Sequence, residues 1–252
     1  MTQTKQTAVI TGASHGIGKA CALGFARAGW NTVWASRNLS ALHAAVAELE
    51  TSKASVLTVQ CDVSKPEQVE ALFDEAIGTF GRIDLLFNNA GISVPGGFID
   101  EIPLEAWEQT LAVNLTGAFL CARAAFSRMR KQQPQGGRII NNGSIAAHTP
   151  RPRMLPYSVT KHAITGLTKC LALDGREFDI ACSQIDIGNV RTEMTAAMVK
   201  GMLQANGEYK SEPVFELPQV VEAVLFMASL PPAANVQFMT VMATKMPFLG
   251  RG

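Results

Sequence analysis

Surplus charge and long apolar runs are both missing from this chain of 252 residues. The formal net charge is +1, so no global field favours binding to nucleic acid or to an anionic membrane. No continuous apolar run approaches the roughly 20 residues that a membrane helix needs. The first residues are polar and lack the apolar core of a secretion signal. We therefore expect a cytoplasmic protein with neither nucleic acid nor a membrane as a partner.

Cysteine spacing that would signal a metal site or a redox pair is missing too. The five cysteines are odd in number, and none lies in a CxxC pattern. His43, His148 and His162 have no partner at metal-ligand spacing, and we expect them on the surface. The sequence therefore predicts reduced and mostly buried thiols, and no metal site.

What the chain does have is a regular alternation of strand-like and helix-like segments. Apolar or β-branched runs predict strands at 7–11, 31–35, 55–60, 83–87, 138–142, 179–186 and 236–241. Helical spacing of apolar residues predicts helices at 16–29, 39–51, 66–80, 104–131, 156–174 and 218–230. Such alternation predicts an α/β fold in which a doubly wound parallel sheet of about seven strands carries helices on both faces. No linker stands out, so residues 1–252 are expected to form a single domain.

One segment breaks this alternation. Residues 190–215 are irregular, and we interpret them as a loop-helix insertion that closes over a substrate. Met194, Met198 and Met202 recur there at i, i+4 and i+8, which predicts a helical stripe. Such a stripe packs in the core or lid, or else lines an apolar substrate pocket.

A glycine-rich turn joins the first predicted strand to the first predicted helix. Its sequence is Thr11-Gly12-Ala13-Ser14-His15-Gly16-Ile17-Gly18. Glycine is needed where the backbone turns tightly, approaches a pyrophosphate or lets a helix pack closely on a strand. The helix N-terminus that follows offers free N–H groups and a favourable dipole to a phosphate. A glycine triplet alone is weak evidence, but its place between a strand and a helix favours a dinucleotide site.

Four further motifs follow in order, each beside a predicted element. They are Asn88-Asn89-Ala90-Gly91 after the strand at 83–87, Asn114 in the helix at 104–131, Ser144 after the strand at 138–142, and Tyr157 with Lys161. With the GxxxGxG spacing of the glycine turn, this set resembles the short-chain dehydrogenase/reductase family over nearly the whole chain. The resemblance implies a Rossmann-like fold, a nicotinamide cofactor, and four catalytic residues, namely Asn114, Ser144, Tyr157 and Lys161.

The residues after the second predicted strand bear on the choice of cofactor. A carboxylate there would bind the adenosine ribose and repel a 2′-phosphate, whereas an arginine would pair with that phosphate. Ser36 stands where NAD-preferring members of the family carry Asp, Arg37 follows it, and His15 is a further polar contact. These residues favour NADP(H) over NAD(H). The resemblance implies that the other cofactor contacts are Gly12, Ser14, Gly16, Ile17, Gly18, Asp62, Val63, Asn89, Ala90, Gly91, Tyr157, Lys161, Gly188, Val190 and Thr192. Asp62 is equally suited to cap the next helix.

Tyr157 and Lys161 lie one helical turn apart and so share a helix face. Tyrosine has an unperturbed pKa near ~10, and a nearby ammonium favours the phenolate and lowers that pKa. The resemblance implies that Tyr157 moves the proton of the substrate oxygen while Ser144 holds that oxygen. It further implies that Lys161 binds the nicotinamide ribose and that Asn114 holds a water linking Lys161 to solvent. The expected substrate is a small carbonyl compound or alcohol.

The pattern departs from the family after the strand at 179–186. Ile187 replaces the family's proline, and we expect Asp186 before it to alter the pocket wall. Arg151 and Arg153 lie in the substrate loop, where they face either an acidic substrate or solvent.

Two other functions stay open at this point. One is an NAD-preferring dehydrogenase, against which Ser36 and Arg37 argue. The other is a catalytically idle NADP-binding sensor or scaffold, against which the complete catalytic set argues. The resemblance also implies a homo-oligomer, a tetramer or dimer, formed through the helices that contain Asn114 and Tyr157.

Overall fold

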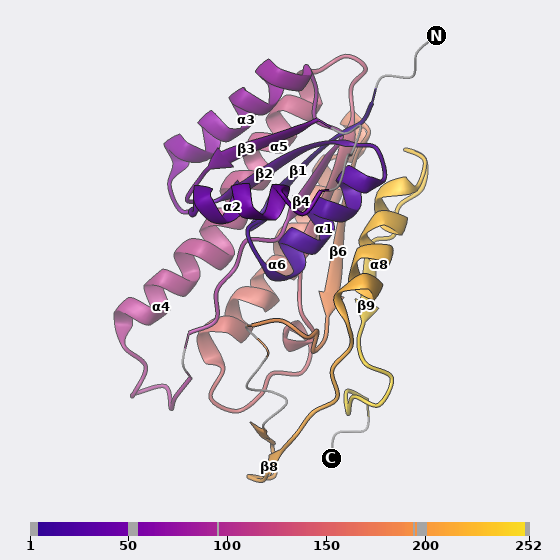
Figure 1. Ribbon diagram of the computed structural model, residues 1–252. Coiled ribbons are helices and arrows are strands. Elements are labelled where there is room, and N and C mark those ends of the chain that lie inside the picture. The colour runs from indigo at the N-terminus through magenta and orange to yellow at the C-terminus, as the bar shows by residue number, and fades with distance from the viewer. Residues whose placement is uncertain (1–4, 50–54, 95, 194, 196–200, 250–252) are drawn as a thin grey trace.

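Seven parallel strands form one sheet in the order β3-β2-β1-β4-β5-β6-β9 (Figure 1). The computed structural model describes residues 5–49, 55–94, 96–193, 195 and 201–249. The strands are β1 (Thr7–Thr11), β2 (Asn31–Ser36), β3 (Val56–Gln60), β4 (Leu85–Asn88), β5 (Gly137–Asn142), β6 (Ile180–Ile187) and β9 (Phe238–Val241). This confirms the predicted doubly wound α/β sheet. The strand order reverses between β1 and β4, and ligands of such folds bind at the carboxyl ends of the strands at this point.

Helices cover both faces of the sheet (Figure 1). One face carries α1 (Gly16–Arg27), α2 (Leu39–Val46) and α8 (Leu217–Ser229), whose apolar side chains pack around the buried Trp34 and Phe25. The other face carries α3 (Pro66–Phe80), α5 (Ala118–Lys131) and α6 (Leu155–Asp174), with a core around Phe73 and Met129, and α4 (Leu104–Leu111) contacts α6. Two apolar layers therefore hold the sheet rigid beneath its carboxyl edge.

Several predicted boundaries differ from the observed ones by one to a few residues; the helix predicted at 39–51, for example, ends at Val46. Two of the differences have a clear local reason. The helix predicted at 16–29 ends at Arg27, because Gly29 adopts a left-handed φ of 90° and Trp30 donates back to the carbonyl of Phe25 at 3.1 Å. The strand predicted from Ile83 begins at Leu85. The N–H and C=O groups of Ile83 both bond to the Gln132 side chain, at 3.0 and 2.9 Å, instead of to a strand.

The start of α3 also differs from what its sequence predicts. The pattern Ser64-x-x-Glu67 predicts a capping box, but Lys65 is the N-cap residue and no side chain caps the helix. The Ser64 hydroxyl and N–H instead donate to Oδ1 of Asp62, at 2.7 and 3.0 Å. Asp62 thus closes a turn before the helix, and Pro66 occupies its first position.

The helix predicted at 104–131 is interrupted by a π-helical segment, Ala112–Gly117, between α4 and α5. By length and composition Leu104–Lys131 is the one described helix able to cross a membrane, but 56% of its most apolar window is buried in the protein. Inside the π-helical segment, Asn114 accepts the N–H of Ile92 at 2.8 Å and donates to the carbonyl of Ile92 at 2.9 Å. The wider turn therefore coincides with a side chain that is fixed to the loop after β4, and π-turns are frequent at functional sites.

The segment 190–215 is closed at its base. Val190 pairs with Phe215, whose carbonyl accepts the N–H of Arg191 at 2.9 Å. Further out, β7 (Met202–Leu203) and β8 (Tyr209–Lys210) form a short antiparallel hairpin. Met202 therefore lies in a strand, not in the predicted helical stripe, and Met194 and Met198 lie outside the described residues.

The thiols match their prediction. All five cysteines are unpaired, four of them are buried, and Cys170 is exposed. Burial raises the pKa of the Cys182 thiol to about 12. Burial first, and the nearby Asp62 charge second, raise the pKa of Cys61 to about 12. These thiols stay protonated at neutral pH and act as small apolar side chains.

Candidate active site

The glycine turn between β1 and α1 carries no side chain at Gly12, Gly16 and Gly18, as a phosphate cradle requires. Gly12 and Gly16 have left-handed φ values of 67° and 55°. A Cβ added to Gly18 would overlap the carbonyl oxygen of Gly12, so neither the turn nor the helix start tolerates a side chain there. The N–H groups at the start of α1 are left for a ligand. The residues present therefore fit the pyrophosphate of a dinucleotide.

One cavity of about 210 Å³ runs from this turn across the carboxyl ends of β1, β4 and β5. It is lined by every residue for which the sequence predicts a cofactor or catalytic role, except Asn114. The lining includes Gly12, Ser14, His15, Gly16, Ile17, Gly18, Ser36, Arg37, Asp62, Val63, Asn89, Ala90, Gly91, Ser144, Tyr157, Lys161, Gly188, Val190 and Thr192. The fold thus gathers motifs that lie far apart in the sequence around a single space, which we call the cofactor cavity.

At one end of the cofactor cavity, polar side chains surround the end of β2. Ser36 is held by the N–H of Asn38, which donates to its Oγ at 3.1 Å, and Arg37 is exposed. Burial alone would raise the pKa of the Asp62 carboxyl, but hydrogen bonds from Ser64 and the charges of Arg37 and Lys65 lower it overall. Asp62 is bonded to Ser64, and Arg37 is an exposed cation that lines this end of the cavity.

At the other end, Tyr157 and Lys161 project from the first two turns of α6. The Nζ atom of Lys161 lies 5.6 Å from the centre of the Tyr157 ring. Lys161 is buried, and its Nζ donates to the backbone carbonyl of Asn142 at 2.7 Å. The end of β5 therefore positions the charge of Lys161 beside the Tyr157 ring, and the sequence pattern did not identify Asn142 as the partner that holds it.

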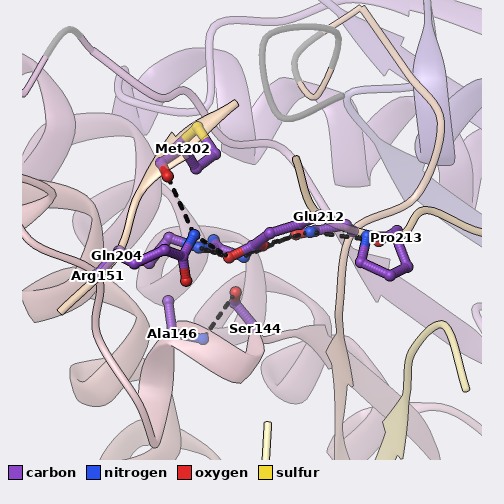
Figure 2. A network of polar contacts seen from close by, with 8 residues as sticks. Ser144, Ala146, Arg151, Met202, Gln204, Glu212 and Pro213 are labelled. Carbon is purple, nitrogen blue, oxygen red and sulfur yellow. Dashed lines mark hydrogen bonds and ion pairs between the residues drawn. The ribbon is translucent and has the colours of Figure 1, made fainter. Parts of the chain in front are cut away.

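Ser144 lies between these elements, directly after β5. Its Oγ accepts the N–H of Ala146 at 3.1 Å, so the hydroxyl hydrogen is left for another acceptor (Figure 2). The backbone N–H of Ser144 donates to Oδ1 of Asp186 at 2.9 Å. Oδ1 of Asp186 also accepts a hydrogen bond from the side-chain amide of Gln184 at 2.7 Å, and Oδ2 of Asp186 lies 2.8 Å from Nε2 of His148.

The placement of Asp186 corrects its predicted role. Asp186 is only 1% exposed and does not line the cofactor cavity, so it supports Ser144 from behind instead of altering the pocket wall. A Cβ on Gly143 would overlap Oδ1 of Asp186, which is why glycine precedes Ser144. His148 is exposed, as the sequence predicts for this histidine, and it pairs with the buried carboxylate of Asp186.

Two asparagines that the sequence singles out hold backbone with their side chains. Asn114 bonds Ile92, as above, and lies 3.4 Å from the hydroxyl of Thr160. Asn89 donates to the carbonyl of Thr11 at 2.9 Å and accepts from Asn142 at 2.8 Å. Asn89 therefore fastens the glycine turn to the ends of β4 and β5, while its backbone lines the cofactor cavity.

The replacement of the family's proline by Ile187 leaves the following loop intact. Gly188 donates to the carbonyl of Val241 at 2.8 Å, and a side chain at Gly188 would meet Met242. The N–H of Thr192 donates to Thr195 at 3.0 Å. Thr192 packs over Gly16, because a Cβ added to Gly16 would lie 3.7 Å from the methyl group of Thr192. The loop thus returns to the glycine turn.

The two arginines of the substrate loop have different environments. The Arg151 side chain is buried, and its guanidinium pairs with Glu212, with Nε 3.3 Å from Oε1 and Nη2 on Oε2 (Figure 2). Nη2 also donates to Oδ1 of Asn189 at 2.9 Å. Arg153 instead lies over the ring of Phe98, 4.6 Å from its centre. Arg151 is therefore neither solvated nor free to meet an acidic substrate alone.

Glu212 is the partner that sequence reasoning missed. It comes from the segment 190–215, accepts from Asn189 at 2.7 Å and from Gln204 at 3.1 Å, and is 4% exposed (Figure 2). Burial would raise the pKa of Glu212, but hydrogen bonds from Arg151, Asn189 and Gln204 outweigh it and lower that pKa. Periodicity cannot signal a pair that joins two irregular segments across the fold.

Comparison with known proteins finds relatives that match most of the chain. A family model for short chain dehydrogenases matches residues 6–202. The 3-oxoacyl-[acyl-carrier-protein] reductase of Synechocystis sp. (strain ATCC 27184 / PCC 6803 / Kazusa) is 32% identical over 243 residues, which cover 92% of this chain and 93% of that protein. Glucose 1-dehydrogenase 2 of Bacillus subtilis (strain 168) is 35% identical over 191 residues, 75% of this chain and 74% of the relative. The crystal structure of acetoin dehydrogenase YohF from Salmonella typhimurium has a TM-score of 0.80 at 32% identity, over 94% of each chain.

Proposed function

The chain belongs to the short-chain dehydrogenase family, and we propose that it transfers a hydride between NADP(H) and a carbonyl compound or secondary alcohol, with Tyr157 as general acid/base. The observation that carries this proposal is the buried ammonium of Lys161, fixed by Asn142 and 5.6 Å from the Tyr157 ring. Ser144 lines the same cavity, as does the glycine turn that fits a pyrophosphate. An idle nucleotide sensor has no use for this charge arrangement.

In the reduction direction, Tyr157 donates its phenolic proton to the carbonyl oxygen. The Ser144 hydroxyl donates a hydrogen bond to the same oxygen and stabilises the negative charge that develops there. Lys161 stabilises the phenolate that remains and binds the nicotinamide ribose. When bound, the nicotinamide supplies the hydride. Asn114, whose side chain is taken up by Ile92, acts through its backbone in the π-helical segment, by holding a water that returns a proton by way of Lys161.

The choice of NADP(H) rests on the end of β2. Ser36 brings no carboxylate to this end of the cofactor cavity, and Arg37 is exposed there beside the partly exposed Ser14 and the exposed His15. The Ser14 hydroxyl lies 2.9 Å from Nδ1 of His15. A 2′-phosphate would meet one cation and two hydrogen-bonding side chains, whereas an unmodified ribose would leave Arg37 without a ligand.

The described residues of the segment 190–215 are proposed to form a wall that closes on the substrate. Support comes from Val190, Thr192, Glu193 and Thr195, which line the cofactor cavity, and from the bridge between Val190 and Phe215 that closes the base of the segment. Water excluded by this wall would otherwise compete for the substrate oxygen.

Self-association into a dimer or tetramer is part of the proposal. Its support is exposed apolar surface on α5 and α6, where Phe119, Val159 and Leu173 point to solvent in the monomer. Two copies that bury these side chains would also cover the outer face of the helix that carries Tyr157. Light scattering on the purified protein measures the mass and decides between monomer and oligomer.

Turnover with NADPH and with NADH tests the proposed function. The purified protein is assayed with a panel of aldehydes, ketones and hydroxyketones, and the oxidation of each cofactor is followed by absorbance. We expect carbonyl-dependent oxidation of NADPH with kcat/KM at least about tenfold above that for NADH, as one lost phosphate contact implies. Activity with NADH alone would overturn the cofactor assignment. Tight NADPH binding without turnover of any carbonyl would favour the idle sensor.

A further inference from the structure

Arg151 is a nearly buried cation that lines the cofactor cavity, and only part of its guanidinium is bonded to other residues. Its residue exposure is 9%, and it lines the cavity together with Met154 from the same loop. Nε donates to Glu212, and Nη2 donates to Glu212 and to Asn189. These bonds use three of the five N–H groups of the guanidinium. In the described part of the chain, nothing accepts from the two N–H groups of Nη1.

Glu212 cannot bind a substrate in place of Arg151. Its two carboxylate oxygens already accept hydrogen bonds from Arg151, Asn189 and Gln204. An ionised carboxylate has no hydrogen to donate, so Glu212 cannot donate a hydrogen bond to a substrate oxygen. The positive charge of Arg151 is therefore cancelled from within the protein. What the pair offers to the cavity is a hydrogen-bond donor edge without net charge.

We propose that Nη1 of Arg151 binds a second, uncharged oxygen of the substrate, so that the enzyme prefers neutral carbonyl compounds bearing a further hydroxyl or keto group over keto acids. This rests on the proposed function, whose reacting oxygen is held by Ser144 and Tyr157. A neutral oxygen gains a charge-assisted hydrogen bond from Nη1. A carboxylate would put a second negative charge on a guanidinium that Glu212 already neutralises, in a buried place where like charges repel strongly. The negative charge of Glu212 thus disfavours the binding of acidic substrates.

The test compares carbonyl substrates that differ only in the second group. Acetone, hydroxyacetone and pyruvate form one such set, and sets of longer homologues place the second oxygen farther from the carbonyl. With NADPH, we expect the best hydroxyketone to exceed its parent ketone in kcat/KM by about tenfold or more, and the matching keto acid to be the poorest of its set. A wild-type preference for the keto acid would overturn the inference while leaving the proposed function in place. Absence of NADPH oxidation with every carbonyl would instead count against the function itself.

Three variants separate the role of Arg151 from a purely structural one. Arg151→Met should lower kcat/KM for the hydroxyketone about tenfold more than for the parent ketone, mainly through KM. Glu212→Gln keeps the shape but leaves Arg151 charged, so it should raise the ratio of keto acid to hydroxyketone turnover about tenfold. The control Glu216→Gln breaks the exposed pair with Arg191, which is 2.8 Å long, and should leave this ratio unchanged.

The double variant Arg151→Met/Glu212→Met guards against loss of folding. It removes both charges at once, so the protein should keep its circular dichroism and its activity on the simple ketone. The preference for the hydroxyketone should then disappear. Equal losses on the ketone, hydroxyketone and keto acid in Arg151→Met, or an unchanged ratio in a folded Glu212→Gln, would show that the pair only holds the loop and would refute the inference.

Discussion

Asp186 holds Ser144 in place through its backbone, with Oδ1 of the buried carboxylate 2.9 Å from the Ser144 nitrogen. The Ser144 hydroxyl is thereby fixed at the end of β5 without using its own hydrogen. The same carboxylate binds Gln184, and its other oxygen binds His148. Because the Asp186 carboxylate bonds the Ser144 nitrogen and does not line the cofactor cavity, a change at Asp186 should move Ser144 rather than the cofactor.

The variant Asp186→Ala tests this support. It leaves the buried N–H of Ser144 without an acceptor, which should cost on the order of 1–3 kcal/mol of stability and lower kcat about tenfold or more. The Kd for NADPH should stay near the wild-type value. Asp186→Asn keeps an oxygen acceptor and should recover most of kcat. His148→Ala removes only the exposed partner and should leave kcat within about twofold. Equal losses in Asp186→Asn and Asp186→Ala would contradict the account.

Gly18 and Gly78 offer a matched pair of alanine substitutions. A Cβ at Gly18 overlaps the carbonyl of Gly12, so Gly18→Ala must displace the glycine turn and should abolish NADPH binding measured by fluorescence or calorimetry. Gly78 lies within α3 with no atom within 4 Å of the added Cβ. Gly78→Ala should therefore stabilise the protein by up to about 1 kcal/mol and leave NADPH binding unchanged. Retention of NADPH binding in Gly18→Ala would argue against the phosphate cradle.

Cofactor preference should reverse when the end of β2 is recharged. Ser36→Asp places a carboxylate where the 2′-phosphate is proposed to bind, and Arg37→Ala removes the cation. The double variant should raise KM for NADPH by about a hundredfold, as two lost charge interactions imply, while KM for NADH falls or stays constant. Steady-state kinetics with both cofactors measures this. A parallel rise in both KM values would mean that the substitutions only disturb the fold.

The pair of Arg151 and Glu212 makes stability depend on pH. The pKa of Glu212 is lowered from its ordinary value of 4.5, so its contribution is fully present above that value and is lost as pH falls through the lower, folded-state pKa. Glu212→Gln should reduce the free energy of unfolding at neutral pH by on the order of 3–5 kcal/mol, because Arg151 is left buried without its counter-charge. Urea unfolding at a series of pH values should find this difference shrinking in acid. A difference that stays constant down to about pH 3 would mean that ionisation of Glu212 contributes nothing.

Sequence patterns predicted the parts of this protein that depend on local periodicity and on short motifs. The sheet and the glycine turn follow from apolar spacing and from glycines placed between a strand and a helix, whereas the grouping of Ser144, Tyr157 and Lys161 is what the family resemblance implies. What the patterns missed are bonds between segments that are distant in sequence. Asp186 behind Ser144, and Glu212 beside Arg151, are set by how loops pack after the sheet has formed.

The capping prediction failed for a local reason of a different kind. The Ser64 side chain could either cap the helix or hydrogen-bond to Asp62 in a turn, and in the structure it bonds to Asp62. Such competition between short polar side chains leaves no trace in the periodicity of apolar residues.

Removal of one phenolic hydroxyl tests the central proposal most directly. The chain has two tyrosines, and Tyr209, which is 72% exposed in the β7–β8 hairpin, provides the matched control for Tyr157. Tyr157→Phe should lower kcat for NADPH-dependent carbonyl reduction by about 10²–10⁴-fold and leave the Kd for NADPH close to the wild-type value, whereas Tyr209→Phe should leave both unchanged. A Tyr157→Phe protein that is folded, binds NADPH and retains wild-type kcat would contradict the assignment of Tyr157 as the acid/base.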